Sequence, residues 1–226
     1  MLSKLIVALD VDSKEKAAVL VDQLADITDI FKVGLQLFTI AGPEIVKLIQ
    51  DKGSKVFLDL KLHDIPNTVA KAVESGQKMG VWAMTLHIAG GKEMLLTAAG
   101  IHPRPQLWGV TVLTSLNDDN LKQIGYRHTV KDQVINFAKI AKDNQLDGLI
   151  CSPQEISHVR PLVGDAFTIV TPGVRVKKSS DDQKRTMSAA EAVKSGADFI
   201  VVGRPILEAA DARTATLSIL KDIGEQ

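Results

Sequence analysis

The sequence has little cysteine, no net charge and no long apolar run. Cys151 is the single cysteine of the 226 residues, so no disulfide can form within the chain, which is typical of a reducing cytoplasm. Lysine plus arginine and aspartate plus glutamate number 27 each, and zero formal net charge argues against a general binder of nucleic acid or membrane surfaces. No apolar run approaches the roughly 20 residues of a transmembrane helix, and the first residues lack the pattern of a secretory signal. We therefore expect a cytoplasmic protein with no nucleic-acid or membrane partner.

The common motifs of hydrolases and metal sites are also missing. Cys-x-x-Cys, His-Glu-x-x-His, Gly-x-Ser-x-Gly and the phosphate-binding Walker loop do not occur in the sequence. Metal-dependent, serine-dependent and ATP hydrolysis are therefore unsupported, and we expect a reaction that needs neither metal nor cofactor. Cys151 lies in an apolar segment, where a free cysteine packs as a small hydrophobic side chain.

Eight short apolar segments, rich in β-branched residues, are spread along the chain. They lie at residues 5–9, 30–33, 56–60, 82–86, 107–113, 148–151, 167–170 and 199–202. Nearly continuous apolar runs are typical of parallel strands that are covered on both faces. Helix-like stretches separate them, at 13–24, after Pro43, and at 67–78, 92–99, 130–143, 153–159, 188–194 and 205–223. This alternation predicts an α/β fold, a single (β/α)8 TIM barrel over residues 1–226; an open doubly wound sheet is the alternative.

The expected strands end in residues that could form a site. Active sites of (β/α)8 barrels lie at the carboxyl ends of the strands. Charged and hydrogen-bonding groups are costly to bury there unless they serve a common purpose. In chain order these groups are Asp10, Lys32, the stretch 59–64, His87, Thr114 and Ser115, the stretch 171–175, and Gly203 with Arg204. We expect a structural, hydrogen-bonded role for His87 and assign none to His63.

Four ionisable side chains converge on the mouth of the expected barrel. Asp59 and Lys61 share one face of a strand because alternate side chains point the same way, and Asp10 faces inward by the same rule. Lys32 lies inside an apolar strand. A lone buried charge costs roughly several kcal/mol, but charges of alternating sign offset this cost. The arrangement predicts an active site; a structural ion-pair network that closes the barrel top is the alternative.

A second cluster predicts a phosphate site. Gly203 and Arg204 stand at the start of the last expected helix, where backbone N–H groups bind anions and an arginine adds a two-pronged donor. Barrels often bind phosphate in the loops after strands seven and eight, and Pro172 and Arg175 follow the seventh expected strand. A glycine turn with a solvated arginine is the alternative. The polar segment 177–185 suits either a mobile lid or an idle surface loop.

The stretch 59–68, Asp-Leu-Lys-Leu-His-Asp-Ile-Pro-Asn-Thr, resembles the signature of the orotidine 5′-phosphate decarboxylase family. An Asp-x-Lys-x-x-Asp core followed by Ile-Pro-Asn-Thr is a specific match, and the resemblance extends over the whole chain. Further motifs similar to the family lie at 7–10, 31–34, 87–91, 112–115, 171–175, 182–185 and 202–205. The resemblance implies a catalytic (β/α)8 domain that converts orotidine 5′-monophosphate to uridine 5′-monophosphate, the last step of de novo pyrimidine synthesis. It also implies a homodimer whose sites are shared across the interface.

The resemblance further implies a role for each matched residue. Lys61 is the proton donor to C6 of the pyrimidine, and Asp59 flanks the scissile carboxylate together with Asp64 of the partner subunit. Lys32 completes the charge array and contacts the ribose. The other substrate contacts are Asp10 with the nucleotide, Thr68 of the partner subunit, Thr114 and Ser115 with the base, and Pro172, Arg175, Gln183, Gly203 and Arg204 at the phosphate, with Gln183 on the closing loop.

Two other functions are compatible with parts of this pattern. A sugar-phosphate decarboxylase or synthase of the same superfamily would keep the Asp-x-Lys-x-x-Asp core, but such relatives resemble Mg²⁺ enzymes with an acidic residue in the place of Lys32. A lysine cannot ligate Mg²⁺ beside Asp59. A non-catalytic nucleotide-phosphate sensor would need the Arg204 cluster but not Lys61 between two carboxylates. The charge array therefore favours the decarboxylase.

Overall fold

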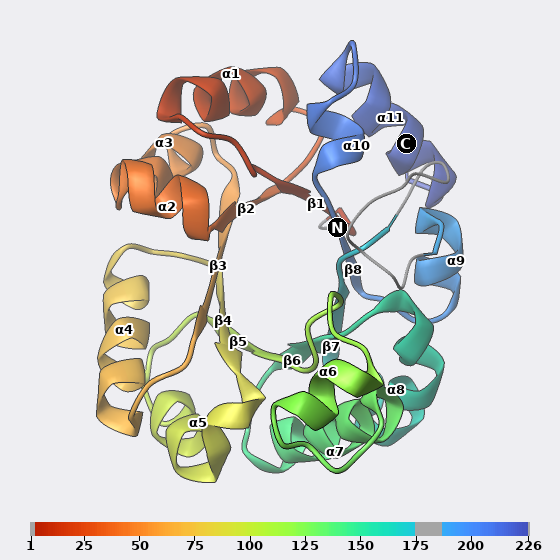
Figure 1. The fold of residues 1–226 in the computed structure, drawn as a ribbon. Coiled ribbons are helices and arrows are strands. Elements are labelled where there is room, and N and C mark those ends of the chain that lie inside the picture. Colours follow the sequence, from red (N-terminus) through yellow and green to blue (C-terminus); the bar gives the residue numbers. More distant parts are fainter. Residues whose placement is uncertain (1–2, 175–186, 226) are drawn as a thin grey trace.

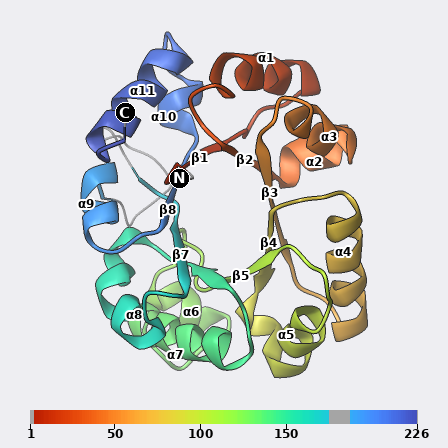
Figure 2. The same ribbon diagram turned by 180° about the vertical axis from the view of Figure 1, so that it is seen from behind.

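The computed structural model describes residues 3–174 and 187–225. Its eight strands are parallel and form a closed barrel in the order β1 to β8 (Figure 1, Figure 2). They are β1 (Leu5–Ala8), β2 (Ile30–Gly34), β3 (Lys55–Leu62), β4 (Ala83–His87), β5 (Gln106–Val110), β6 (Gly148–Ile150), β7 (Thr168–Thr171) and β8 (Phe199–Val202). Leu5 of β1 pairs with Ile200 of β8, which closes the barrel. The predicted (β/α)8 TIM barrel is confirmed, and the open doubly wound sheet is wrong.

The helices form the outer layer around the strands (Figure 1). They are α1 (Lys14–Leu24), α2 (Leu35–Ala41), α3 (Glu44–Gln50), α4 (Pro66–Lys78), α5 (Gly91–Ala99), α6 (Asp118–Gln123), α7 (Val130–Asp143), α8 (Ile156–Val163), α9 (Ala189–Lys194), α10 (Arg204–Leu207) and α11 (Ala212–Asp222). Two 3₁₀ turns, η1 (Ile88–Gly90) and η2 (Pro153–Glu155), precede α5 and α8. Within residues 3–174 and 187–225, no helix has both the length and the apolar character to cross a membrane.

The prediction of a single helix over residues 205–223 is wrong. This part of the chain forms two helices, α10 and α11. Asp211 separates them with an extended backbone (φ −137°, ψ 106°), and its carboxylate accepts the backbone N–H groups of Arg213 and Thr214 at 2.9 and 3.2 Å. An aspartate in this position is a helix N-cap, so a new helix begins after it. The division leaves α10 as a short helix that begins with Arg204.

Apolar side chains from alternate strand positions fill the barrel interior. The interior cluster consists of Ile6, Ala8, Ile30, Phe57, Ala83, Trp108, Val170 and Val201. The rings of Phe57 and Trp108 meet edge to face with their centroids 4.7 Å apart, an arrangement that aromatic pairs prefer. This cluster fills the barrel interior, so a ligand can bind only at an end of the barrel.

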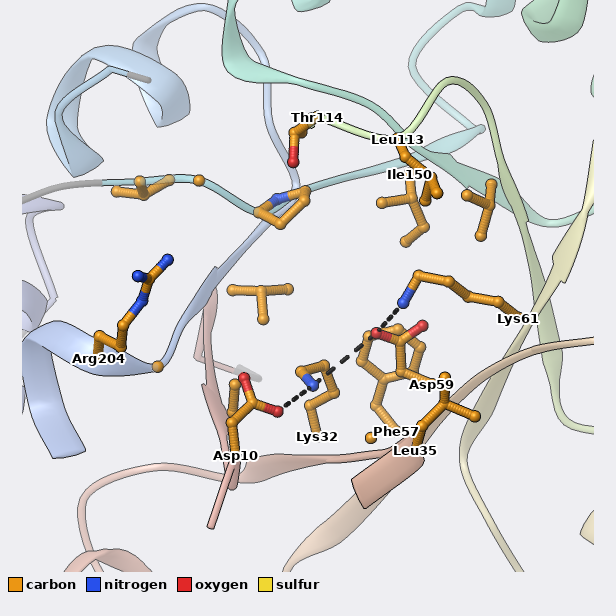
Figure 3. A pocket seen from close by; sticks show the side chains of 18 of the residues that line it. Asp10, Lys32, Leu35, Phe57, Asp59, Lys61, Leu113, Thr114, Ile150 and Arg204 are labelled. Carbon is orange, nitrogen blue, oxygen red and sulfur yellow. Dashed lines mark hydrogen bonds and ion pairs between the residues drawn. The ribbon is translucent and has the colours of Figure 1, made fainter. Parts of the chain in front are cut away.

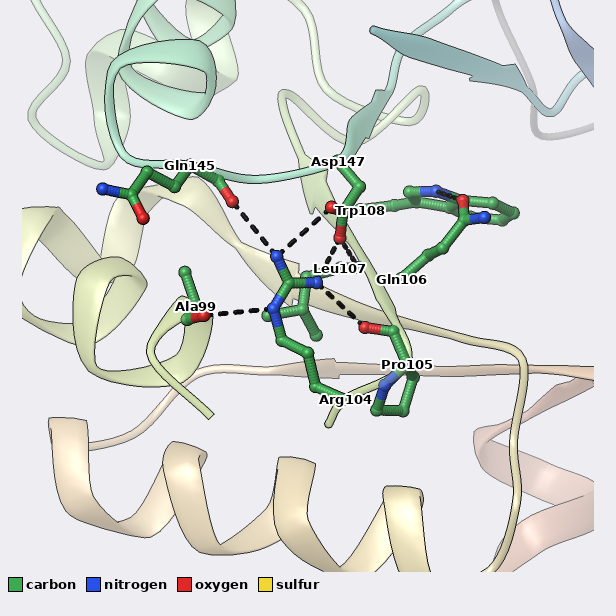
Figure 4. A network of polar contacts seen from close by, with 8 residues as sticks. All are labelled: Ala99, Arg104, Pro105, Gln106, Leu107, Trp108, Gln145 and Asp147. Atoms are coloured by element: carbon green, nitrogen blue, oxygen red, sulfur yellow. Dashed lines mark hydrogen bonds and ion pairs between the residues drawn. The ribbon is translucent and has the colours of Figure 1, made fainter. Parts of the chain in front are cut away.

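Two arginines tie neighbouring strands together at the amino ends of the barrel. Arg104 donates to the carboxylate of Asp147, which also accepts the backbone N–H of Leu107 at 2.7 Å (Figure 4). The other acceptors of this guanidinium are the carbonyl oxygens of Ala99, Pro105 and Gln145. Arg160 and Asp198 repeat the arrangement, with Asp198 accepting a backbone N–H of β7. This end of the barrel is therefore held by satisfied charge pairs, and the opposite end is left for chemistry.

Candidate active site

A cavity of about 740 Å³ opens at the carboxyl ends of the strands. Every strand except β4 contributes a lining residue, either from its last positions or from the loop that follows. Phe57, Ala8 and Val201 of the interior cluster also line it, so the packed barrel interior forms its floor. Figure 3 shows Phe57 beside Asp59. The volume suits a ligand of nucleotide size, because small-molecule sites typically measure about 300–1,000 Å³.

Four charged side chains form a line across one side of this cavity. Lys32 Nζ donates to Asp10 Oδ1 at 2.9 Å, and Lys61 Nζ donates to Asp59 Oδ2 at 2.8 Å. Lys32 Nζ also lies 3.9 Å from Asp59 Oδ2, so negative and positive groups alternate from Asp10 to Lys61 (Figure 3). We call these four residues the charge array. The structure thus brings together the four ionisable groups that the strand ends predicted.

The two central members of the charge array are withdrawn from water. The side chains of Lys32 and Asp59 are 10% and 13% exposed, against 54% for Asp10. Burial raises the pKa of Asp59, but the positive charges of Lys61 and Lys32 and hydrogen bonds from Lys61 and Thr85 outweigh it, and the pKa is lowered. Asp59 is therefore a carboxylate at neutral pH and keeps an ammonium group beside it.

Lys61 does not reach the cavity by regular strand alternation. Its φ of 51° lies in the left-handed region, which is uncommon for a residue other than glycine. The pairing of β3 with β4 shifts register between Leu58 and Leu62, so the backbone of β3 bulges at this point. The prediction that Asp59 and Lys61 face the same cavity agrees with the structure, but the backbone that achieves it is irregular.

The side of the cavity opposite Lys61 carries Arg204, the first residue of α10 (Figure 3). Pro172 and Gly203 line the same cavity. A Cβ on Gly203 would lie 3.3 Å from Asp10 Oδ2 and 3.4 Å from the Ala8 Cβ, so glycine permits the close approach of β8 to β1. Because α10 has only four residues, Arg204 and local N–H groups, rather than a helix dipole, would hold an anion here. Arg175, Gln183 and the segment 177–185 lie outside the described residues.

An apolar wall faces the charge array. Figure 3 shows Leu113 and Ile150 across the cavity from Asp59, and Val112 and Cys151 also line it. Cys151 is buried, as expected, but it borders the cavity as well as the core. Among the predicted base contacts, Thr114 lines the cavity, whereas Ser115 is exposed and does not. A flat apolar group with one polar edge could therefore lie between the wall and Lys61.

The profile of the family described as orotidine 5′-phosphate decarboxylase / HUMPS matches residues 3–219. The chain belongs to this family. An orotidine 5′-phosphate decarboxylase of Saccharophagus degradans is 44% identical over 225 residues, which cover 97% of this chain and 94% of the relative. One of Trichlorobacter lovleyi is 45% identical over 229 residues, with 98% and 95% covered. The crystal structure of orotidine 5′-phosphate decarboxylase from Lactobacillus acidophilus superposes with a TM-score of 0.86 at 37% identity, covering 98% of this chain and 99% of that chain. The resemblance inferred from the motifs is confirmed.

Two residues of the family signature lie away from the cavity of their own chain. Asp64 and Thr68 are exposed, and neither lines the cavity. The carboxylate of Asp64 accepts the backbone N–H of Ile65 at 2.6 Å, and Ile65 itself is 68% exposed. These three residues therefore lie on the surface of the single chain.

His63 and His87 form a pair beside the charge array. Their ring centroids are 5.4 Å apart. Burial lowers the pKa of His87, and electrostatic interactions with His63 and Lys61 lower it further against the opposing effect of Asp59. His87 is therefore neutral at neutral pH and adds no charge to the site.

Several residues at the site were not predicted from the sequence. Thr85, which contacts Asp59, lies in the middle of β4 and has no motif to mark it. Leu35, Ile150 and Glu208 line the cavity, but from the sequence alone they resemble ordinary core or surface residues. Val112 and Leu113 also line it; they lie in the motif 112–115, but the motif predicted no role for them. Only the alternation of strand faces could have pointed to Phe57 as the floor. Within the described part of the chain, no three His, Cys, Asp or Glu side chains are grouped so that they could hold a metal ion.

Proposed function

We propose that this chain is a carboxy-lyase that converts orotidine 5′-monophosphate to uridine 5′-monophosphate, with no metal or organic cofactor. The observation that carries the proposal is the ion pair of Lys61 and Asp59, held at 2.8 Å inside a cavity whose far side carries Arg204. The same conversion is the last step of de novo pyrimidine synthesis. Residues 1–226 would act as one catalytic domain in the cytoplasm.

Lys61 supplies the proton of the reaction. Cleavage of the bond between C6 and the carboxylate releases CO₂ and leaves the electron pair on C6 of the pyrimidine. The ammonium of Lys61 stabilises that negative charge as it develops and then transfers a proton to C6. Lys61 becomes a neutral amine and regains a proton from solvent, so no oxidant, reductant or metal is required.

Asp59 has two effects on this step. As a carboxylate with a lowered pKa, it places a negative charge 2.8 Å from Lys61 Nζ and so holds the ammonium group at the reacting position. It also lies beside the place that the carboxylate of the substrate would occupy, because both groups approach Lys61. The repulsion between the two carboxylates is relieved when CO₂ leaves.

The remaining groups position the nucleotide. Asp10 and Lys32 form the end of the charge array that is farther from Lys61, and they would hydrogen-bond the ribose hydroxyls. Thr114, with Ser115 beside it, would hydrogen-bond the polar edge of the base. Arg204 suits the phosphate. Gly203, Pro172, Arg175 and Gln183 complete the proposed phosphate site, the last two from outside the described residues. The phosphate is far from the bond that breaks, so its binding energy serves positioning.

We further propose that the enzyme is a homodimer with composite sites. Asp64 and Thr68 would reach the cavity of the other chain, where Asp64 of the partner subunit would flank the substrate carboxylate opposite Asp59. Their exposure on their own chain supports this arrangement, as does the exposed Ile65 between them. In a two-fold dimer the same loop serves both sites.

The charge array disfavours a Mg²⁺-dependent sugar-phosphate enzyme of the same superfamily. The Asp59 carboxylate already faces two ammonium groups, at 2.8 and 3.9 Å, and a divalent cation would have to displace both. A phosphate sensor would not need this array, which is costly to bury. The first alternative does not account for Lys32, and the second does not account for Lys61.

The direct test is the loss of orotidine 5′-monophosphate absorbance with the purified protein, with uridine 5′-monophosphate and CO₂ identified as products. A Lys61→Ala variant is the matched control, because the phosphate site stays intact. Decarboxylation by the parent and its loss in the variant would support the proposal. A parent protein that binds the nucleotide but releases no CO₂ would refute it.

A further inference from the structure

Three residues of β3 stand opposite a single residue of β4 at the site. Leu58 pairs with Met84 and Leu62 pairs with Leu86, so Asp59, Leu60 and Lys61 together face Thr85. Regular main-chain pairing cannot continue through a mismatch of this kind. The left-handed φ of 51° at Lys61 lies within the same stretch.

The side chain of Thr85 replaces the missing main-chain partner. Its Oγ1 accepts the backbone N–H of Lys61 at 2.9 Å and donates to Asp59 Oδ1 at 2.8 Å. The residue is fully buried, with 0% of its surface exposed. Because an N–H group can only donate, the hydroxyl proton of Thr85 is left for the carboxylate.

This hydroxyl also sets the orientation of the Asp59 carboxylate. With Oδ1 bound to Thr85, the other oxygen, Oδ2, is the one that meets Lys61 Nζ at 2.8 Å. One buried group therefore contacts the main chain of Lys61 and the side chain of Asp59. The branched Cβ of a threonine restricts rotation about χ1, so the hydroxyl is held in place between them.

We propose that Thr85 is a positioning residue for the decarboxylation: its hydroxyl holds the left-handed backbone of Lys61 and the carboxylate of Asp59 in one fixed arrangement. The proposal rests on the proposed function, because it assumes that Lys61 delivers the proton. Thr85 lies outside the set of cavity-lining residues, so it acts through the two residues that it binds.

The test compares Thr85→Val, which keeps the shape and removes the hydroxyl, with Thr85→Ser, which keeps the hydroxyl. For Thr85→Val we expect kcat to fall by about 10- to 100-fold with KM changed by less than about 3-fold, because a hydrogen bond to a charged group is lost away from the substrate. Thr85→Ser should stay within about 5-fold of the parent. The acid limb of the kcat profile should move to higher pH in Thr85→Val alone, since losing a donor raises the pKa of Asp59.

Thr28→Val is the matched control. Thr28 is also a buried threonine, 3% exposed, and its hydroxyl donates to the Leu5 carbonyl oxygen at 3.2 Å at the other end of the barrel. Thr28→Val should lower the unfolding free energy and leave kcat unchanged. A loss of kcat in Thr85→Val would then come from positioning and not from lower stability. If Thr85→Val does not fold, Thr85→Ala gives the same comparison with Thr85→Ser.

Three results would overturn the proposal: parent-like kcat in Thr85→Val, a loss confined to KM, or a serine variant as slow as the valine variant. The decarboxylase activity of the parent enzyme shows whether the positioning proposal or the proposed function has failed. A parent without decarboxylase activity refutes the function, and in that case a crystal structure of Thr85→Val still decides the positioning. An unchanged Lys61 backbone and Asp59 carboxylate would overturn it, and a relaxed bulge with a rotated carboxylate would support it.

Discussion

Replacing Asp59 by asparagine removes a carboxylate that two buried or half-buried ammonium groups share. Its oxygen lies 2.8 Å from Lys61 Nζ and 3.9 Å from Lys32 Nζ. Removing one partner of a buried ion pair typically costs about 3–5 kcal/mol of unfolding free energy. Two features reduce this value: Lys61 is 31% exposed, and Lys32 keeps Asp10 at 2.9 Å. We therefore expect Asp59→Asn to lose about 2–3 kcal/mol at pH 7.

The pH dependence of this loss follows from the lowered pKa of Asp59. A carboxylate whose pKa is lower in the folded than in the unfolded chain contributes stability above the unfolded value of about 4. That contribution is lost as the pH falls through the folded pKa. The difference between parent and Asp59→Asn should therefore be constant at neutral pH and narrow once the pH falls below about 4.

Urea unfolding at a series of pH values measures both effects, with Asp10→Asn as the control. Asp10 is 54% exposed and pairs with one lysine, so its replacement should cost less than about 1 kcal/mol. The turnover of Asp59→Asn should also fall by about 100-fold or more, because Lys61 loses the carboxylate that holds its ammonium group at 2.8 Å inside the cavity. Equal stability losses in the two variants would refute the electrostatic reasoning. So would a difference in unfolding free energy between the parent and Asp59→Asn that stays constant down to acid pH.

Three further predictions concern the phosphate, the cofactor and the dimer. Arg204→Ala should weaken substrate binding by about 10- to 100-fold through loss of a charge-assisted hydrogen bond, and kinetics equal to the parent would contradict the phosphate site. Activity should survive exhaustive chelation; activity that vanishes and returns with Mg²⁺ would favour the sugar-phosphate alternative. Lys61→Ala and Asp64→Ala should each be nearly inactive, yet mixing them should restore roughly a quarter of parent activity, because one site of each mixed dimer carries neither change. No recovery after subunit exchange, demonstrated with tagged chains, would place both residues in the same site.

The barrel could be predicted from the sequence because its strands are covered on both faces. Each strand is then a short apolar run, and eight such runs alternating with helices fit few other folds. Element ends were less predictable. The fifth apolar run extends to Leu113, yet β5 ends at Val110, and the last residues of the run turn out of the sheet to line the cavity. Hydrophobicity alone does not separate a buried strand from an apolar cavity wall.

The charges of the site were also visible in the sequence, because ionisable residues at strand ends need a reason to be there. Thr85 was not visible, because its importance depends on a register shift between two strands. That shift is a property of the folded sheet and leaves no local signal in either strand. The left-handed backbone of Lys61 has the same origin, since lysine has no preference for that conformation.

In the proposed mechanism, in which Lys61 donates the proton, the charge balance of the site constrains the order of events in one turnover. The two carboxylates and two ammonium groups of the charge array sum to zero in the free chain. The substrate carboxylate adds one negative charge, which stays on C6 when neutral CO₂ leaves. Proton transfer makes C6 neutral and leaves Lys61 as an amine, so the negative charge passes to the array. A new substrate carboxylate would be repelled by Asp59 in that state, and Lys61 must therefore regain its proton from solvent before the next nucleotide binds productively.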